Sequence, residues 1–398
     1  MKKRLICGAA ALLSSVAQAD TRSYIDLQGG AGYSTNPLLL TDMDEDSGFG
    51  RISAYAFHGW STPRSESSVS AYVENTSYLR EYGNQEAFEV AARSRRNVSE
   101  NLVVFGSANF RGDYSAQLGT RFFGPPREPV PVDVIAPDPV IVVDPDLFAL
   151  NRRQYSVAGQ LGLSTRLSER DALTTAVGLQ RLFLSDDGGD LDFTQADASA
   201  EWSRTINERL TAGLRVILQR SDFSRGRSIT SYGPQATAQL QLSENWELSG
   251  ALGFVRVEQD GGELLGELNS IDLAADASLC RNVEQERLCA RVARRTQSSI
   301  LGGAPTTTSA GLDAYRRLSA RDTVQASASL ARSDGLRIGG VEQKSGFYSL
   351  TAGYDRVFGD RLSGGVNLSA RRLVVSGPNP RADVGGSLYL RYRIGDLR

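Results

Sequence analysis

The chain has 398 residues, with 44 Lys and Arg against 46 Asp and Glu, and a mean hydropathy of −0.27. So balanced a charge does not favour nucleic acid as a partner. Beyond the N-terminal 19 residues no apolar run approaches the ~18 residues that a spanning helix needs, so a helical membrane protein is excluded. No shift of composition divides the chain, and a single domain is expected.

The N-terminus has the pattern of a secretory signal. Basic residues 2–4 precede a short apolar run at 5–16, and small residues at 17–19 provide a cleavage site. We therefore predict a signal peptide over 1–19, cut between Ala19 and Asp20. Because the signal holds three of the cations and none of the acids, the domain 20–398 carries a net charge of about −5.

After the signal, apolar and polar residues alternate in many short stretches. In the stretch 271–280, for example, Ile271, Leu273 and Ala275 alternate with Asp272, Ala274 and Asp276. A period of two places the two sets on opposite faces of a strand. Eighteen strands are expected, or sixteen if two of them merge, at 21–33, 49–60, 65–78, 86–97, 101–112, 152–166, 171–184, 192–205, 209–221, 229–242, 246–258, 268–280, 287–298, 306–318, 322–333, 344–357, 361–375 and 382–395.

Six similar polar turns recur at a nearly constant interval. They lie at 166–170, 204–208, 241–245, 281–285, 317–321 and 356–360, roughly 38 residues apart. Each repeat unit then holds two strands, one tight turn and one longer connection. This pattern predicts an all-β protein, a single antiparallel up-and-down transmembrane β-barrel of the bacterial outer membrane, with its tight turns and termini in the periplasm. Its first partners would be outer-membrane lipid and the barrel-assembly machinery.

The connection at 113–151 differs from the others in length and composition. It lies between the fifth and sixth predicted strands and holds seven of the 13 prolines, interspersed with aspartates. Connections this long are usually functional or disordered. One interpretation has it fold into the lumen or cover the outer mouth, and the other leaves it as a mobile surface loop.

The alternation also predicts which charged residues face the lumen. Charges of both signs on this face are typical of a selective aqueous pore, and equally of a solvated lining that ties the walls together. The predicted pore-lining residues are Arg93, Arg95, Arg111, Arg166, Arg215, Arg291, Arg295, Arg371, Arg391, Arg393, Asp197, Glu201, Asp272 and Asp276.

Two further residue types bear on chemistry. Cys280 and Cys289 lie symmetrically about the turn at 283–286 and point to the same side, so a disulfide across this hairpin is expected in an oxidising compartment. His58 is the only histidine, and its neighbours Phe57 and Trp60 suggest an interfacial girdle. No phosphate-binding loop or metal-ligand spacing occurs, so neither enzyme activity nor a cofactor is expected.

The end of the first predicted strand carries a short motif, Gly30-Ala-Gly-Tyr-Ser-Thr-Asn-Pro37. It resembles outer-membrane β-barrel proteins of Gram-negative exopolysaccharide synthesis and export systems. The resemblance implies a porin-size pore for a polysaccharide chain, with a periplasmic export lipoprotein as a further partner. The arginine-rich lumen favours an anionic polymer. A general or sugar-selective diffusion porin and a non-conducting barrel serving as adhesin or scaffold remain alternatives. The final residues 395–398 lack the usual terminal aromatic and are expected to form a short tail.

Overall fold

The computed structural model describes residues 20–41, 45–114, 153–184, 192–224, 227–260, 267–296, 298, 303–338 and 341–396. The predicted signal and most of the connection 113–151 lie outside these residues. Within them the chain forms β1 Asp20–Ser34, β2 Ser47–Thr62, β3 Ser65–Tyr78, β4 Asn84–Ser99, β5 Leu102–Tyr114, β6 Arg153–Arg166, β7 Asp171–Leu184, β8 Phe193–Asn207, β9 Leu210–Phe223, β10 Ser228–Ser243, β11 Trp246–Asp260, β12 Glu267–Val283, β13 Glu286–Thr296, β14 Thr306–Arg317, β15 Asp322–Ile338, β16 Val341–Val357, β17 Leu362–Val375 and β18 Asp383–Gly395.

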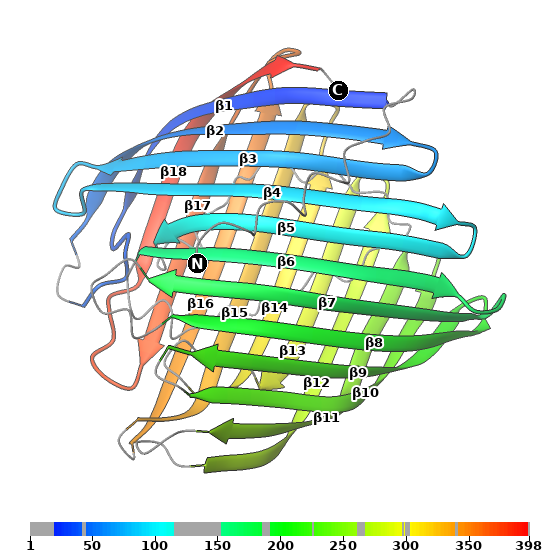
Figure 1. Cartoon of the computed structure of the whole chain (residues 1–398). Helices are drawn as coiled ribbons and strands as arrows, with labels where there is room; N and C mark the ends of the chain where they lie inside the picture. Colours follow the sequence, from blue (N-terminus) through cyan, green and yellow to red (C-terminus); the bar gives the residue numbers. More distant parts are fainter. Residues whose placement is uncertain are drawn as a thin grey trace, which may run out of the picture.

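The strands form one closed antiparallel sheet. Each pairs with its neighbours in the sequence, and β1 also pairs with β18 from Tyr24 opposite Gly395 to Ser34 opposite Gly385. Figure 1 shows the early strands crossing in front of the late ones, as in a tilted barrel. This confirms the predicted fold class and settles the strand number at eighteen. Among the described residues, no helix is long and apolar enough to cross a membrane.

The repeated turns have one structural role. In the turns Leu167–Asp171 and Leu318–Asp322 the serine hydroxyl donates to the carboxylate of the aspartate three positions later, which begins the next strand, at 2.7 and 2.6 Å. In all six repeats a turn carbonyl accepts a backbone hydrogen bond of 2.8 Å from the far end of the next hairpin, as Arg170 does from Thr205. The repeat in the sequence is therefore the junction that fastens each hairpin to the next.

The barrel has two different ends. The turns just described, the first residue of β1 and the last of β18 lie at one end, here called the turn end. The other ends of the strands lie opposite, at what is here called the loop end. All three tryptophans, Trp60, Trp202 and Trp246, lie on the outer face near the turn end, where the ring centroid of His58 is 5.4 Å from that of Trp60 in a tilted arrangement. Such an aromatic girdle is typical of a membrane interface.

The outer face of the wall is apolar. Large side chains such as Ile52, Leu214 and Leu388 are exposed there, whereas their strand neighbours turn inward. Because the pleat reverses at every residue, this face could not be buried within the same barrel. The strand ends differ most from prediction at β15, which continues to Ile338, and at β16, which starts at Val341, since backbone pairing resumes after a register shift between Ser333 and Leu336 that the side-chain pattern does not mark.

Candidate functional site in the barrel lumen

The strand register places all fourteen predicted pore-lining residues on the inner face. Glu89 opposite Arg111, Glu201 opposite Arg215 and Asp276 opposite Ala293 illustrate the pairing, because directly opposed residues share a face of the sheet. Alternation in the sequence therefore indicates the face that these fourteen side chains take, and their role in lining a pore stays a prediction.

The inner wall divides into sectors with many charges and sectors with few. Charged residues gather on β18 and β1–β5, and again on β8, β9 and β11–β14. Between these sectors β6–β7 and β15–β16 present mainly small polar residues, and among the described side chains their charges are confined to Arg166 and Asp355 near the turn end. Cross-strand hydroxyl contacts join Thr174 to Ser164 at 3.1 Å and Ser329 to Ser349 at 2.6 Å. The two strand pairs are nine strands apart in a ring of eighteen, so the two weakly charged strips face each other across the lumen.

Several of the lumen arginines are held by carboxylates. Arg393 makes a bidentate pair with Asp26, both contacts at 2.7 Å, and its guanidinium lies 4.0 Å from the ring centroid of Tyr24. Asp276 receives Arg215 at 3.4 Å and Arg295 at 3.2 Å. Such pairs tie strands of the wall together, and the two charges of a pair offset each other. The number of arginines therefore overstates how cationic the lumen is.

Three of the predicted lumen arginines are not paired with a carboxylate in the part of the chain that the structure describes. Arg93 and Arg166 are exposed on the inner face and have no carboxylate partner among the described residues, and Arg391 lies over the ring of Tyr389 at 5.6 Å. Arg93 is on β4, Arg166 on β6 and Arg391 on β18. These are the cations that a passing solute would meet.

Arg371 is covered at the loop end. Its guanidinium donates to Asp383 at 3.0 and 2.6 Å and to the carbonyl of Pro37 at 2.9 Å, and both partners of the pair are 2% exposed. Asp383 also accepts from the hydroxyl of Ser34 and the backbone of Asn36. Arg371 therefore positions the β1–β2 connection and is not a contact for solutes in this conformation, although the sequence predicted it as pore-lining.

The β1–β2 connection enters the mouth of the barrel. The side chain of Asn36 bonds to the backbone of Leu40 and Arg381, and Leu39 packs on Phe347 and Leu373 of the inner wall. Leu39 has a φ of 52°, a left-handed conformation that a leucine keeps only where its surroundings enforce it. The Asn-Pro motif thus attaches the β1–β2 connection to the inner wall. The attached connection narrows the opening of the lumen at the loop end.

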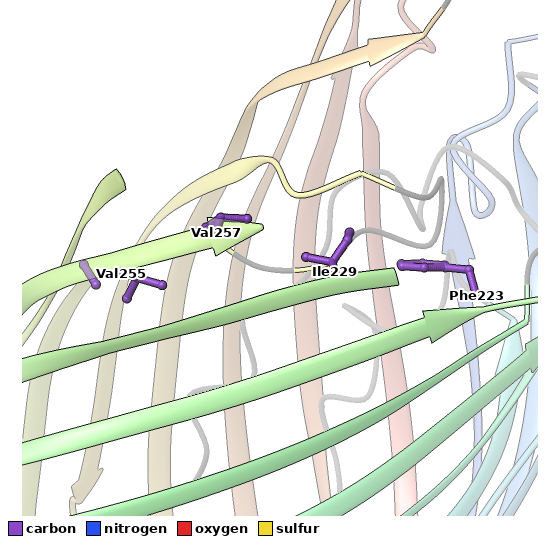
Figure 2. Packing of buried hydrophobic residues seen from close by; sticks show 5 residues of the cluster. Phe223, Ile229, Val255 and Val257 are labelled. Atoms are coloured by element: carbon purple, nitrogen blue, oxygen red, sulfur yellow. The ribbon is translucent and has the colours of Figure 1, made fainter. Parts of the chain in front are cut away.

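A second apolar group narrows the opposite side of the mouth. Phe223, Ile229, Val255 and Val257 turn inward and are buried with Ala274, as Figure 2 shows, and Ala304 from the β13–β14 connection packs against them. The sequence pattern did not predict this cluster, because apolar residues of a membrane barrel are expected on the outer face. The signal was present, since Val255 and Val257 stand on the same face as the polar Gln259 and Ser249.

Aromatic residues of the lumen lie flat against the wall. The ring of Phe105 covers Gly162 on the next strand, where a Cβ would meet it at 2.3 Å, and Tyr389 covers Gly365 in the same way at 2.7 Å. The hydroxyl of Tyr389 also donates to Asp355 at 2.6 Å. Because of these contacts the rings lie along the wall and do not project into the lumen.

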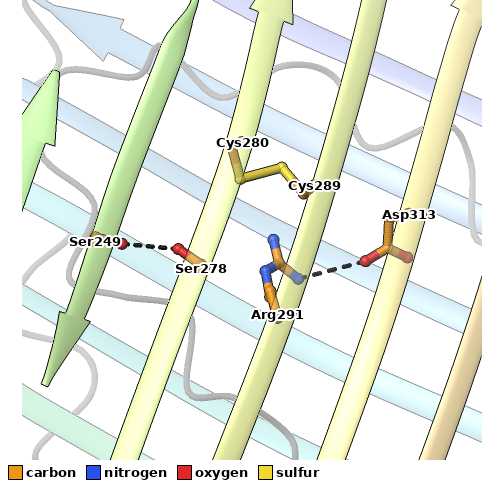
Figure 3. Close-up of a disulfide and its surroundings, with 6 residues drawn as sticks. All are labelled: Ser249, Ser278, Cys280, Cys289, Arg291 and Asp313. Atoms are coloured by element: carbon orange, nitrogen blue, oxygen red, sulfur yellow. Dashed lines mark hydrogen bonds and ion pairs between the residues drawn. A yellow bond between two sulfur atoms is a disulfide. The ribbon is translucent and has the colours of Figure 1, made fainter. Parts of the chain in front are cut away.

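The cysteines form a disulfide on the inner face near the turn end. Cys280 of β12 and Cys289 of β13 are directly opposed with a Cα–Cα distance of 4.1 Å. Figure 3 shows the bridge beside the Ser249–Ser278 contact and the Arg291–Asp313 ion pair, which is 3.6 Å long. The bridge links the two strands that a single turn already joins.

Replacing both cysteines by serine should lower the free energy of unfolding by about 3 kcal/mol, because a bridge of this short loop restricts the unfolded chain. Chemical unfolding of the refolded barrel under oxidising and reducing conditions measures this difference. Ser278→Ala serves as a control that removes one neighbouring hydrogen bond, with an expected loss of about 1 kcal/mol. Equal stability of the oxidised and reduced wild-type barrel would contradict the prediction.

No protein-family model matches the chain, and no curated protein matches it in sequence. Among solved structures it is similar to OccK2 (OpdF) of Pseudomonas aeruginosa, at 13% identity and TM-score 0.46 over 95% of this chain and 99% of that one. It is also similar to OccK9 (OpdG) of the same organism, at 14% identity and TM-score 0.47, with 95% and 99% covered. The FrpB iron transporter of Neisseria meningitidis matches at 10% identity and TM-score 0.47 over 92% of this chain, which spans 64% of that one. Likenesses this distant do not extend to function.

Proposed function

We propose that the protein is an outer-membrane pore for polar solutes. The proposal rests on the distribution of side chains over the closed sheet: the outer face is apolar, and the inner face is polar and charged. This is the reverse of a soluble protein, which buries its apolar side chains. Closure leaves no unpaired strand edge, which is what a lipid environment requires of a β-protein. The aromatic girdle at the turn end supports the same conclusion.

The solute that the lumen suits best is an extended polysaccharide moving outwards. Small hydroxyl and amide side chains form two opposed strips on β6–β7 and β15–β16, and such groups can exchange hydrogen bonds with sugar hydroxyls. The aromatic rings that lie against the wall do not obstruct the lumen. The exposed Arg93 and Arg166 favour an anionic polymer. The resemblance of the motif 30–37 to exopolysaccharide barrels supports this direction and a periplasmic export lipoprotein as partner.

Two other functions each have one observation in their favour. A diffusion porin is favoured by the ion pairs of both signs along the wall, as between Arg215 and Asp276. A non-conducting barrel is favoured by the narrowed mouth, where residues 35–41 and Ala304 cover parts of the inner wall.

Single-channel conductance of the refolded barrel distinguishes the three. We expect a large ohmic conductance that an acidic oligosaccharide blocks more strongly than a neutral one of equal length. Replacing Arg93 and Arg166 by glutamine should reduce this block, because it removes two of the three cations that a passing solute would meet. Arg96→Gln is the matched control, since Arg96 lies on the outer face of the same strand. Conductance indifferent to both sugars would support the diffusion porin, and no conductance the closed barrel.

A further inference from the structure

A row of arginines lies on the outer face near the loop end. The residues are Arg181, Arg220, Arg256, Arg294, Arg332 and Arg372, here called the arginine belt. They stand on β7, β9, β11, β13, β15 and β17, which is every second strand over two thirds of the barrel. All six are exposed. They recur roughly every 38 residues, the period of the turns at the other end.

The arginine belt lies at the boundary of the apolar outer face on the side of the loop end. Two residues before each arginine, on the same face, stand Leu179, Leu218, Phe254, Val292, Leu330 and Ala370, of which the first five are exposed large hydrophobics. Two residues span about 7 Å of a strand. Each guanidinium therefore lies where the acyl region of a bilayer would give way to its headgroups.

The arginines of the belt have N–H donors left with which they can bind an external anion. Arg220, Arg256 and Arg332 each contact a carboxylate two residues further on, at 3.1, 3.0 and 3.0 Å, and each contact is made by Nε. A guanidinium has five N–H donors, so a second anion can bind while this pair persists. Arg181, Arg294 and Arg372 have no carboxylate partner among the described residues.

Two members of the belt are spaced for one phosphate group. Thr308 on β14 is opposed by Arg294 on one side and by Arg332 on the other, so the three residues share one level of the sheet. Their backbones are then about 10 Å apart across two strand spacings. Arg294 already donates to the Thr308 hydroxyl at 3.2 Å. An anion above Thr308 would be within reach of both guanidinium groups.

We propose that the arginine belt binds the phosphate groups of an anionic glycolipid of the lipid A type in the outer leaflet. Arginine matches phosphate oxygens in a bidentate geometry. The loop end faces the cell exterior in a barrel whose short turns are periplasmic, so the belt stands at the level of outer-leaflet headgroups. This inference rests on the proposed outer-membrane location, but it does not depend on what the lumen conducts.

The test uses the purified barrel in detergent micelles and follows its thermal unfolding midpoint. Bisphosphorylated lipid A should raise the midpoint in proportion to its binding to the folded state. The belt variant Arg220→Gln, Arg256→Gln and Arg332→Gln should bind it at least about tenfold more weakly, since three guanidinium groups that attract the phosphates are lost. A second variant, Arg181→Gln, Arg294→Gln and Arg372→Gln, should show a similar loss.

The matched control removes three outward arginines from the turn end. Arg204, Arg281 and Arg356 also pair with carboxylates, at 3.8, 2.7 and 3.5 Å, so their replacement by glutamine changes the net charge by the same amount. This variant should bind lipid A like the wild type. Inorganic phosphate alone and dephosphorylated lipid A should leave the midpoint unchanged.

Three results would overturn the proposal. They are equal binding by wild type and belt variants, equal loss in the belt and control variants, and stabilisation by inorganic phosphate or dephosphorylated lipid A. Conductance of the same variants separates this proposal from that of the pore. A barrel that binds lipid A through the belt but does not conduct would refute the pore and leave the belt intact.

Discussion

Asp383→Asn should lower the free energy of unfolding of the barrel by about 3–5 kcal/mol, the largest effect we expect from one substitution. Arg371 is 2% exposed, so the substitution takes a carboxylate away from a charge that stays buried. An asparagine has one amide oxygen in place of two carboxylate oxygens, so its NH2 group would face either the Arg371 guanidinium or the donors of Ser34 and Asn36. Denaturant unfolding of wild type and variant in the same lipid measures the loss.

Asp313→Asn is the control for this experiment. It removes a carboxylate of the same wall from Arg291, but both side chains are about half exposed and 3.6 Å apart. Water and ions screen such a pair, so the expected change is about 0–1 kcal/mol. If the two substitutions destabilise the barrel equally, the Arg371–Asp383 cluster is not the buried fastening that we describe.

Leu350→Arg should destabilise the barrel in lipid by about 2–4 kcal/mol. Leu350 is 56% exposed at the middle of β16 on the apolar outer face. A guanidinium there would have to enter the hydrocarbon or reach far along the wall to water. Unfolding of the variant in phospholipid vesicles measures the cost.

Ser349→Arg tests the opposite face at the next residue. Ser349 points into the lumen beside Ser329, where water can solvate an added charge. Its effect should be small compared with that of Leu350→Arg. Equal losses at the two positions would show that the outer face does not meet lipid, and the membrane assignment would fail with it.

Strand number and side-chain direction followed from the sequence because both depend on local periodicity. Eighteen alternating stretches predicted eighteen strands, and the period of two placed Arg93, Glu201 and Asp276 on the inner face without any knowledge of their neighbours. The repeated turns at 166–170 and 317–321 were visible for the same reason, since a turn and its hydrogen bonds involve residues a few positions apart.

Only the tertiary structure decided which of these inward residues are exposed to the lumen and which are buried against a partner. Asn36 meets Asp383 across 347 positions, and Asp26 meets Arg393 across 367, so no local pattern separates the buried Arg371 from the exposed Arg166. The inward apolar group around Val257 likewise forms only where four strands and the β13–β14 connection converge. Periodicity determines the face of a strand that a side chain takes, whereas its partner on that face is set by closure of the barrel and by the connections that fold into it.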